Sequence, residues 1–193
     1  MILEFDTYYL SAIQEKDAWK LCDFMVSNQD RFKLYLPKTL AQNLTPDLSR
    51  VFAERKVKEF QNKEELLFTL KEKETNALVG LVYLKSFDWD KNQGEFAYCI
   101  GYQFKGKEII SKAVNELMTY AQRTLGLSLF QIIAHKTNTA SVKVAENCGF
   151  KWVKTLKNGF TPTGKDPLDM ELYEYRYYET SISNFYTYSK MFL

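Results

Sequence analysis

The sequence predicts a mixed α/β fold, with a central mixed, mostly antiparallel sheet of about seven strands and helices on both faces. Three consecutive β-type runs, residues 65–73, 77–87 and 95–102, are joined by short polar segments, which is typical of an antiparallel meander. Helical periodicity over residues 106–125 follows the third run directly. The 193 residues, 46% of them apolar, can bury one substantial core, so residues 1–193 are expected to form a single domain.

The N-terminal part of the chain predicts one strand and two helices. Residues 7–13 form a short β-prone run, and residues 15–26 repeat apolar side chains at helical spacing. A second helix is expected to open at Thr45, which can cap free backbone N–H groups, with Pro46 and Asp47 in its first turn. The apolar stripe expected on this helix consists of Val51, Val57 and Phe60.

The second half of the chain alternates between helices and strands. The helix expected over residues 106–125 has an apolar face made of Ile110, Ala113, Val114, Leu117 and Ala121. The remaining expected elements, in order, are a strand at 127–134, a short helix at 138–147 that ends before Gly149, and closing strands at 150–156 and 168–178.

Composition argues against several functional classes. The 26 basic and 24 acidic side chains leave a formal charge of +2, which gives no argument for a nucleic-acid partner. No secretory signal is evident, and no apolar run approaches the ~18 residues of a membrane span, so we expect a cytoplasmic protein without a membrane partner. The three widely spaced cysteines are expected to be reduced thiols. A single histidine, His135, makes a His-based metal site or a Ser-His triad hard to build, and no metal is expected.

The turn between the third strand and the following helix is the most informative segment. A helix that starts directly after a strand presents unpaired N–H groups and a positive dipole end, which attract phosphate. Gly106 permits close backbone approach, Lys105 and Lys107 add positive charge, and Ser111 can donate a further hydrogen bond. A pyrophosphate fits this pattern. The alternative is an ordinary strand-to-helix turn with two solvated lysines.

Two segments in this order resemble a known family. GEFAYCIGYQFKGKEIISKAV and NTASVKVAENCGF are similar to the strand, phosphate loop and helix, and to the later Asn-x-x-Ser…Gly-Phe element, of the GNAT acetyltransferases. Within that family the chain resembles the RimJ/RimL branch, which acetylates protein N-termini. The resemblance spans about residues 7–178. It implies the GNAT fold, acetyl-CoA as the acetyl donor, and an N-acetyltransferase activity.

The resemblance also implies a donor site. In the family, the pyrophosphate rests on backbone N–H groups of a loop patterned Gln/Arg-x-x-Gly-x-Gly/Ala. That loop maps onto Lys105, Glu108 and Ile110, which all depart from the pattern. A carboxylate beside a pyrophosphate costs about 1 kcal/mol or more at surface dielectric, so Glu108 must point away or weaken binding. The donor-binding residues implied in this loop and helix are Lys105, Gly106, Lys107, Glu108, Ile109, Ile110 and Ser111.

The remaining donor contacts come from the preceding strand and the short helix. The resemblance implies that the pantetheine arm pairs with the strand edge at Tyr98, Cys99 and Ile100, like one more β-strand. Backbone N–H groups around Cys99 and Ile100 are expected to stabilise the oxyanion. Asn138 matches an asparagine that helps to hold the arm in the family, and its alternative role is a plain helix N-cap.

Candidate catalytic groups are few. Glu95 matches a strand glutamate that accepts the amine proton in some family members, and its alternative role is a carboxylate paired with a lysine or exposed to solvent. The tyrosine that often protonates the leaving thiolate is replaced by Ala145, which leaves Ser141 or a water; Ser141 can equally be a helix-surface residue. The Cys99 thiol, on a strand near the expected thioester, is a candidate for a covalent acyl-enzyme intermediate. Cysteine in a buried strand is more commonly an ordinary core residue. His135 either faces the cleft or is structural.

Three functions remain open from the sequence. The first is acetyl transfer to the α-amine of a protein or peptide N-terminus, and the second is transfer to a small amine such as a polyamine, amino sugar or amino acid. The third is a catalytically weak CoA-binding module. An acidic groove would favour polyamines, and an open cleft between the first two helices and the last hairpin would favour a peptide.

The chain is expected to be a monomer or homodimer. Aromatic side chains near the C-terminus are expected either to fill the core or to line an acceptor pocket or dimer surface: Tyr173, Tyr175, Tyr177, Phe185, Tyr186, Tyr188 and Phe192.

Overall fold

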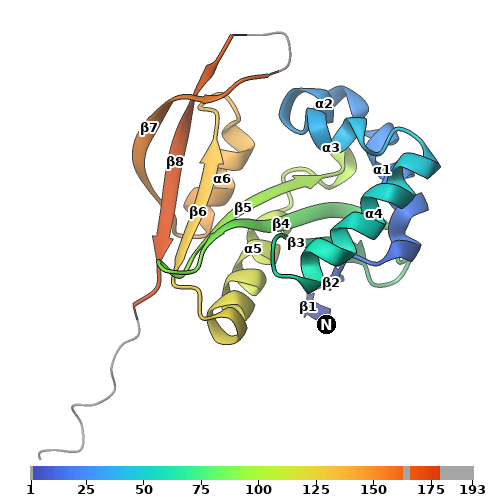
Figure 1. The fold of residues 1–193 in the computed structure, drawn as a ribbon, viewed down its shortest axis with the longest axis horizontal. Coiled ribbons are helices and arrows are strands. Elements are labelled where there is room, and N and C mark those ends of the chain that lie inside the picture. Colours follow the sequence, from blue (N-terminus) through green and yellow to red (C-terminus); the bar gives the residue numbers. More distant parts are fainter. Residues whose placement is uncertain (1, 163–165, 179–193) are drawn as a thin grey trace, which may run out of the picture.

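The structure, a computed structural model, describes residues 2–162 and 166–178 and contains one eight-stranded mixed sheet of order β1-β2-β3-β4-β5-β6-β8-β7 (Figure 1). Neighbouring strands are antiparallel except for β5 and β6, which are parallel. The predicted fold class is confirmed, with one strand more than expected, because β1 pairs with β2 at the sheet edge. The strands are β1 (Ile2–Phe5), β2 (Tyr8–Ala12), β3 (Leu66–Glu72), β4 (Leu78–Asp88), β5 (Gln93–Ile100), β6 (Leu129–Ala134), β7 (Lys151–Phe160) and β8 (Leu168–Arg176).

Helices cover both faces of the sheet, as Figure 1 shows. On one face lie η1 (Glu15–Asp17), α1 (Ala18–Ser27), α2 (Gln29–Tyr35), α3 (Pro37–Ala41) and α4 (Pro46–Gln61). On the other lie α5 (Ile109–Tyr120), its π-helical continuation η3 (Ala121–Leu125) and α6 (Thr139–Asn147), while the 3-10 turn η2 (Tyr102–Phe104) follows β5. The sequence predicted α1, α4, α5 and α6 but missed α2 and α3.

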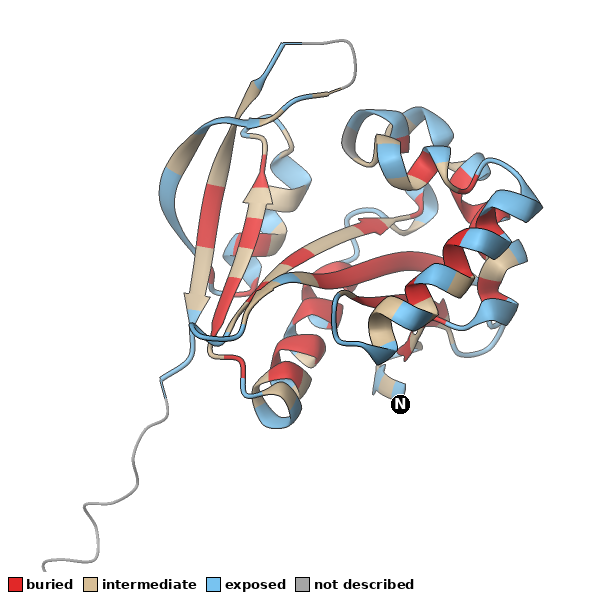
Figure 2. Ribbon diagram, in the orientation of Figure 1, coloured by how far each residue is buried: buried red, intermediate tan, exposed pale blue. Residues whose placement is uncertain are grey.

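Side chains along the central strands alternate between the two faces of the sheet, so the core consists of two layers. In β3, Leu66, Phe68 and Leu70 face the α5 side, whereas Leu67 faces the α1–α4 side. Period-two alternation of this kind is what a strand buried on both faces requires. Figure 2 shows the buried residues concentrated in β3, β4 and the inner sides of the helices. The expected face of α5 is confirmed: Ile110, Ala113, Val114, Leu117 and Ala121 are all buried.

Helix α4 confirms its predicted start and two of the three residues of its predicted apolar stripe. The Thr45 hydroxyl accepts a hydrogen bond from the Leu48 N–H at 3.3 Å, so it is the N-cap. Val57 and Phe60 pack partly buried against the core, as predicted, whereas Val51 is 55% exposed. Phe52 and Ala53 are buried in its place, in the layer that α1 and α4 share.

The sheet separates between β5 and β6. The two strands pair only from Gln93 to Phe96 on the β5 side, and β5 then continues to Ile100 with β4 as its only partner. β6 continues to Ala134 paired with β8. Figure 1 shows the two halves of the sheet diverging from this point. The open edge of β5, defined as residues 97–100, is therefore a strand edge inside the molecule.

The aromatic residues of β8 belong mainly to the core. Tyr173 is buried and Tyr175 packs partly buried against the α5-side layer, while Tyr177 lies beyond the strand and is 42% exposed. The aromatic residues at positions 185–192 lie outside the described residues. Within residues 2–162 and 166–178, no helix combines the length and apolar character that crossing a bilayer demands.

Candidate active site

The open edge of β5 presents unpaired backbone groups. The Gly101 N–H donates to the Val79 carbonyl at 2.9 Å, and hydrogen-bonded pairs recur at every second residue of an antiparallel ladder. Leu81 and Cys99 form the next such pair in the register, so the Cys99 backbone faces β4. The N–H and C=O groups of Tyr98 and Ile100 consequently face away from β4, toward the gap between β5 and β6.

The start of α5 provides a second set of free N–H groups. The first intrahelical bond runs from the Lys112 N–H to the Glu108 carbonyl at 3.1 Å, so the N–H groups of Ile109, Ile110 and Ser111 have no helical acceptor. Gly106 has φ of +79°, and a Cβ added there would meet nothing within 4 Å. The loop therefore lies open beside a helix N-terminus, as an anion site requires.

Glu108 adopts a conformation that explains the glycine of the family pattern. Its φ of 56° and ψ of 11° lie in the left-handed region. A non-glycine residue there costs roughly 1–2 kcal/mol because its Cβ crowds the following carbonyl oxygen. The Glu108 side chain is exposed and lines the adjoining cavity. The chain thus tolerates a residue with a Cβ where the backbone favours glycine.

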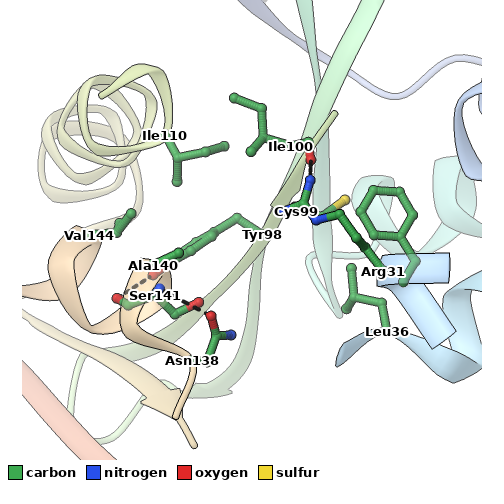
Figure 3. A pocket seen from close by; sticks show the side chains of 11 residues that line it. Arg31, Leu36, Tyr98, Cys99, Ile100, Ile110, Asn138, Ala140, Ser141 and Val144 are labelled. Carbon is green, nitrogen blue, oxygen red and sulfur yellow. Dashed lines mark hydrogen bonds between the residues drawn. The ribbon is translucent and has the colours of Figure 1, made fainter. Parts of the chain in front are cut away.

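Ile110 fills the other position at which the loop departs from the family pattern. Its side chain is buried and joins the core layer beneath α5. In Figure 3, Ile110, Ile100 and Val144 project toward one another from α5, β5 and α6. They form an apolar wall between the loop and the open edge, which both neighbouring cavities share.

Three adjoining cavities follow the gap from the loop to the far side of the sheet. The loop cavity, about 380 Å³, lies beside Gly106 and the start of α5. A narrower throat of about 100 Å³ lies at Tyr98, Cys99 and Ile100. The acceptor cavity, about 510 Å³, opens beyond Tyr98. Shared lining residues, among them Ile100 and Tyr98, join each cavity to the next, so the three form one path.

Tyr98, Asn138 and Ser141 meet at the junction of the throat and the acceptor cavity, as Figure 3 shows. The Asn138 side-chain oxygen accepts from the Ser141 N–H at 3.4 Å, so Asn138 is the N-cap of α6 as well as a cavity residue. The Tyr98 hydroxyl donates to the Ser141 carbonyl at 3.2 Å. Burial raises the pKa of Tyr98, so its phenol stays protonated and its hydrogen bond ties β5 to α6.

Cys99 faces the α1–α4 layer and is chemically quiet. Its side chain is 8% exposed, and burial raises the pKa of the thiol to about 12. The thiolate is the nucleophilic form of cysteine, and it is scarce at neutral pH when the pKa is this high. The side-chain environment therefore argues against the acyl-enzyme reading, although Cys99 does line the throat.

Glu95 and Lys107 lie apart from the three cavities. The Glu95 carboxylate forms an ion pair with Lys85 at 2.8 Å and is 17% exposed at its side chain. The Lys107 ammonium lies 5.7 Å from the centre of the Phe104 ring. Neither residue lines the loop cavity, the throat or the acceptor cavity. The sequence placed both residues near the donor, whereas in the structure Glu95 is paired with Lys85 and Lys107 is exposed beside Phe104.

The acceptor cavity lies between the first helices and the last hairpin. Lys33, Leu34 and Leu36 line it from the α2–α3 side, and Phe160 and Met170 line it from β7 and β8. Among the described residues that line it, no side chain is a carboxylate. His135 lines it too, with Nδ1 2.7 Å from the Thr137 hydroxyl and accepting from the Thr137 N–H at 3.3 Å.

Sequence reasoning missed the residues that α2 and α3 contribute. Arg31 lines the throat and the loop cavity, and Leu36 lines the throat and the acceptor cavity. No motif marks these residues, because their role depends on where two short helices pack. Within the described part of the chain, no group of His, Cys, Asp and Glu side chains is arranged to hold a metal ion.

Comparisons with known proteins agree on one family. A family model described as an acetyltransferase (GNAT) domain matches residues 8–151. YdaF of Bacillus subtilis, named as a ribosomal N-acetyltransferase, is 30% identical over 160 residues, which cover 79% of this chain and 82% of YdaF.

Solved structures show the same fold at lower identity. The ribosomal-protein-S5-alanine acetyltransferase of Vibrio fischeri superposes with a TM-score of 0.84 at 20% identity, over 91% of this chain and 96% of that chain. The microcin C7 self-immunity acetyltransferase MccE, in complex with acetyl-CoA and AMP, gives 0.83 at 23% identity, over 90% and 94%. With the family model covering residues 8–151 and the split sheet in place, the chain belongs to the GNAT acetyltransferases.

Proposed function

We propose that this enzyme transfers the acetyl group of acetyl-CoA to the α-amine at the N-terminus of a protein or peptide. The observation that supports it most directly is the acceptor cavity, which lies between α2–α3 and the β7–β8 hairpin and contains no carboxylate among its described lining residues. A cavity of about 510 Å³ between two separate elements has room for the end of an extended chain.

Several features of the donor side support acetyl-CoA as the acetyl donor. Free N–H groups at the start of α5 and the open loop at Gly106 suit a diphosphate, with Ser111 as a further donor. The unpaired groups of Tyr98 and Ile100 suit the amides of a pantetheine arm, which then lies like an added strand. Acetyl-CoA supplies an activated thioester, and the path of cavities leads from the loop to the acceptor side past Asn138.

Charge in the acceptor cavity argues against cationic small amines. Lys33 lines the cavity and is paired with Asp30 outside it at 2.7 Å, and no described lining residue is acidic. A polyamine carries positive charges along its length, and a binding site for it needs carboxylates to offset their desolvation. A peptide with an uncharged first side chain meets no such requirement, because the walls are largely aliphatic.

An α-amine also suits a site in which few side chains can act as a general acid or base. Its pKa near ~7.7–8 leaves part of it neutral at physiological pH, whereas a lysine amine near ~10.4 is almost wholly protonated. The Tyr98 N–H faces the gap beside the acceptor cavity and is the proposed oxyanion donor, in place of Cys99, whose N–H faces β4. The Ile100 groups, on the loop side, remain for the pantetheine arm. Ser141, beside Tyr98, is the proposed side-chain donor to the leaving thiolate.

A free-thiol release assay tests the proposal directly. Purified enzyme is given acetyl-CoA with peptides that differ in their first residue, the same peptides with a blocked N-terminus, and small amines including a polyamine and an amino sugar. We expect turnover with unblocked peptides that begin with small uncharged residues, and none with blocked ones. Faster turnover of a small amine than of every peptide would overturn the acceptor assignment. Absence of turnover with all acceptors would favour a CoA-binding module.

Glu95→Gln tests the proposed proton acceptor. A general base typically contributes 10²–10⁴-fold to the rate. Glu95 is paired with Lys85 and lines none of the three cavities, so it would act on the amine through water, and an α-amine needs little help. We therefore expect a measurable fall in kcat that stays below about tenfold at neutral pH. Full activity in this variant would remove Glu95 from the mechanism. A loss above a hundredfold would instead make it an essential base.

A further inference from the structure

Arg31 reaches from α2 to the open edge of β5. Its Nη1 donates to the Ile100 carbonyl at 3.2 Å, and its guanidinium carbon lies 6.0 Å from the centre of the Tyr102 ring. The Tyr102 N–H in turn donates to the Asn28 side-chain oxygen at 3.0 Å, at the junction of α1 and α2. Figure 3 shows Arg31 beside Cys99 and Ile100, across the gap from α5 and α6. These hydrogen bonds hold α2 against the end of β5.

The positive charge of Arg31 is not matched by a carboxylate. Among residues 2–162 and 166–178, no acidic side chain forms an ion pair with it, and its neighbour Asp30 is engaged by Lys33. A guanidinium carries five N–H donors, and only one has a described acceptor here. Arg31 is nevertheless half-buried and lines both the throat and the loop cavity.

The loop cavity gathers positive charge from three elements. Arg31 comes from α2, Lys105 from the loop and Lys143 from α6, while Glu108 is the single carboxylate in the lining. Ile109, Ile110 and Ser111, whose N–H groups have no helical acceptor, line the same cavity. Of the three cationic side chains, only Arg31 is half-buried rather than exposed, and only Arg31 also lines the throat. An arginine in that place offers the planar, multiple-donor geometry that phosphate prefers.

We propose that Arg31 recognises the diphosphate of the acetyl donor and, in the free enzyme, rests on the Ile100 carbonyl at the open edge. The inference rests on the proposed function and adds a binding residue outside the phosphate loop. Arg31 supplies the charge that offsets Glu108. When its guanidinium moves to the phosphates, the Ile100 carbonyl loses this hydrogen bond. The carbonyl is then free to pair with the pantetheine arm along the open edge.

A comparison of two acetyl donors tests Arg31 separately from the fold. Acetyl-pantetheine carries the thioester and the arm but lacks the diphosphate. For Arg31→Gln we expect the KM for acetyl-CoA to rise about tenfold to a hundredfold, the range of a lost charge-assisted hydrogen bond, with kcat nearly unchanged. The KM for acetyl-pantetheine should stay the same or fall. Arg31→Lys should lie between, and Arg50→Gln, an exposed arginine paired with Glu54 on α4, serves as the control.

Titration calorimetry with CoA and with pantetheine gives a readout that needs no turnover. We expect Arg31→Gln to weaken CoA and leave pantetheine unchanged. An equal change for both ligands would assign Arg31 a purely structural role, and no change for either would exclude it from donor recognition. If the unmodified enzyme binds CoA without turning over any amine, the proposed function fails while the Arg31 test stands. If it binds no CoA, both proposals fall.

Discussion

Glu108 combines two costs at one position of the phosphate loop. Its backbone is left-handed, and its carboxylate lines the cavity in which a diphosphate is expected. Two variants separate these costs. Glu108→Ala removes the charge and keeps a Cβ, whereas Glu108→Gly removes both.

We expect both Glu108 variants to bind acetyl-CoA more tightly, with a gain that shrinks as salt is raised, because like-charge repulsion is screened. Only Glu108→Gly should relieve the backbone, and its free energy of unfolding should exceed that of Glu108→Ala by about 1 kcal/mol. Urea unfolding and titration calorimetry measure the two quantities. Equal stabilities for the two variants would show that the left-handed backbone costs nothing here.

Cys99 gives the stability of the enzyme a dependence on alkaline pH. The folded thiol keeps its proton up to a pKa of about 12, whereas an unfolded thiol loses it near ~8.5. The folded state therefore holds one proton more across this window, and its stability must fall as pH rises from ~8.5 toward 12. Cys99→Ala removes this contribution.

Urea unfolding at pH 8 and pH 10 checks the effect of Cys99. We expect the unmodified enzyme to lose more stability between these two pH values than Cys99→Ala does. Cys148, whose pKa burial raises to about 11, provides a comparison, since Cys148→Ala should also reduce the loss. Identical pH slopes in the enzyme and Cys99→Ala would contradict the burial argument.

At the scale of elements, α4 shows how a local signal can fix a helix start. The Thr45 hydroxyl caps the Leu48 N–H, and Pro46 follows at the first helical position. Thr45→Ala should lower the free energy of unfolding by about 1 kcal/mol, and Thr45→Ser should lower it by much less, because serine keeps the acceptor. Denaturant unfolding of the two variants measures this. A Thr45→Ala variant as stable as the parent would mean that water replaces the cap.

The elements that the sequence predicted are those with strong local signals. Helix α5 has a long apolar face, and β3, β4 and β5 carry β-type runs with clear turns between them. Helices α2 and α3 are seven and five residues long and are separated by Leu36, with Pro37 opening the second. Helices this short are marginal without tertiary contacts, so their periodicity carries little information. Their cavity residues, Arg31 and Leu36, were hidden for the same reason.

Sequence motifs located the parts of the candidate site that are formed by the backbone. They did not locate the parts that depend on how side chains pack in the fold. The loop at Gly106, the edge at Tyr98 and Ile100, and the cap at Asn138 all lie along the described path of cavities. The Glu95 side chain was placed from its position in the strand, but the register brings Lys85 opposite it, and the two pair. Cross-strand partners are set by register, which a single sequence specifies poorly at this distance.

For the whole molecule, donor binding should join the two halves of the sheet. Ligands that bind only the folded state raise its stability by about 2.7 kcal/mol at a hundred times Kd, which for a chain of this size is about 5–10 °C in Tm. We expect such shifts with both CoA and acetyl-CoA in thermal unfolding, and a smaller shift with pantetheine. The absence of a shift with either coenzyme at millimolar concentration would contradict the donor site.

The separation that begins after Phe96 leaves two backbone amides of a central strand without an acceptor in the neighbouring strand. Amide hydrogens held within a sheet exchange with solvent slowly, at rates that follow local opening. The amides of Tyr98 and Ile100 should instead take up deuterium rapidly in the free enzyme and become protected once a ligand lies along them. Hydrogen exchange at these two positions therefore reports occupancy of the site even in a variant that has lost all turnover.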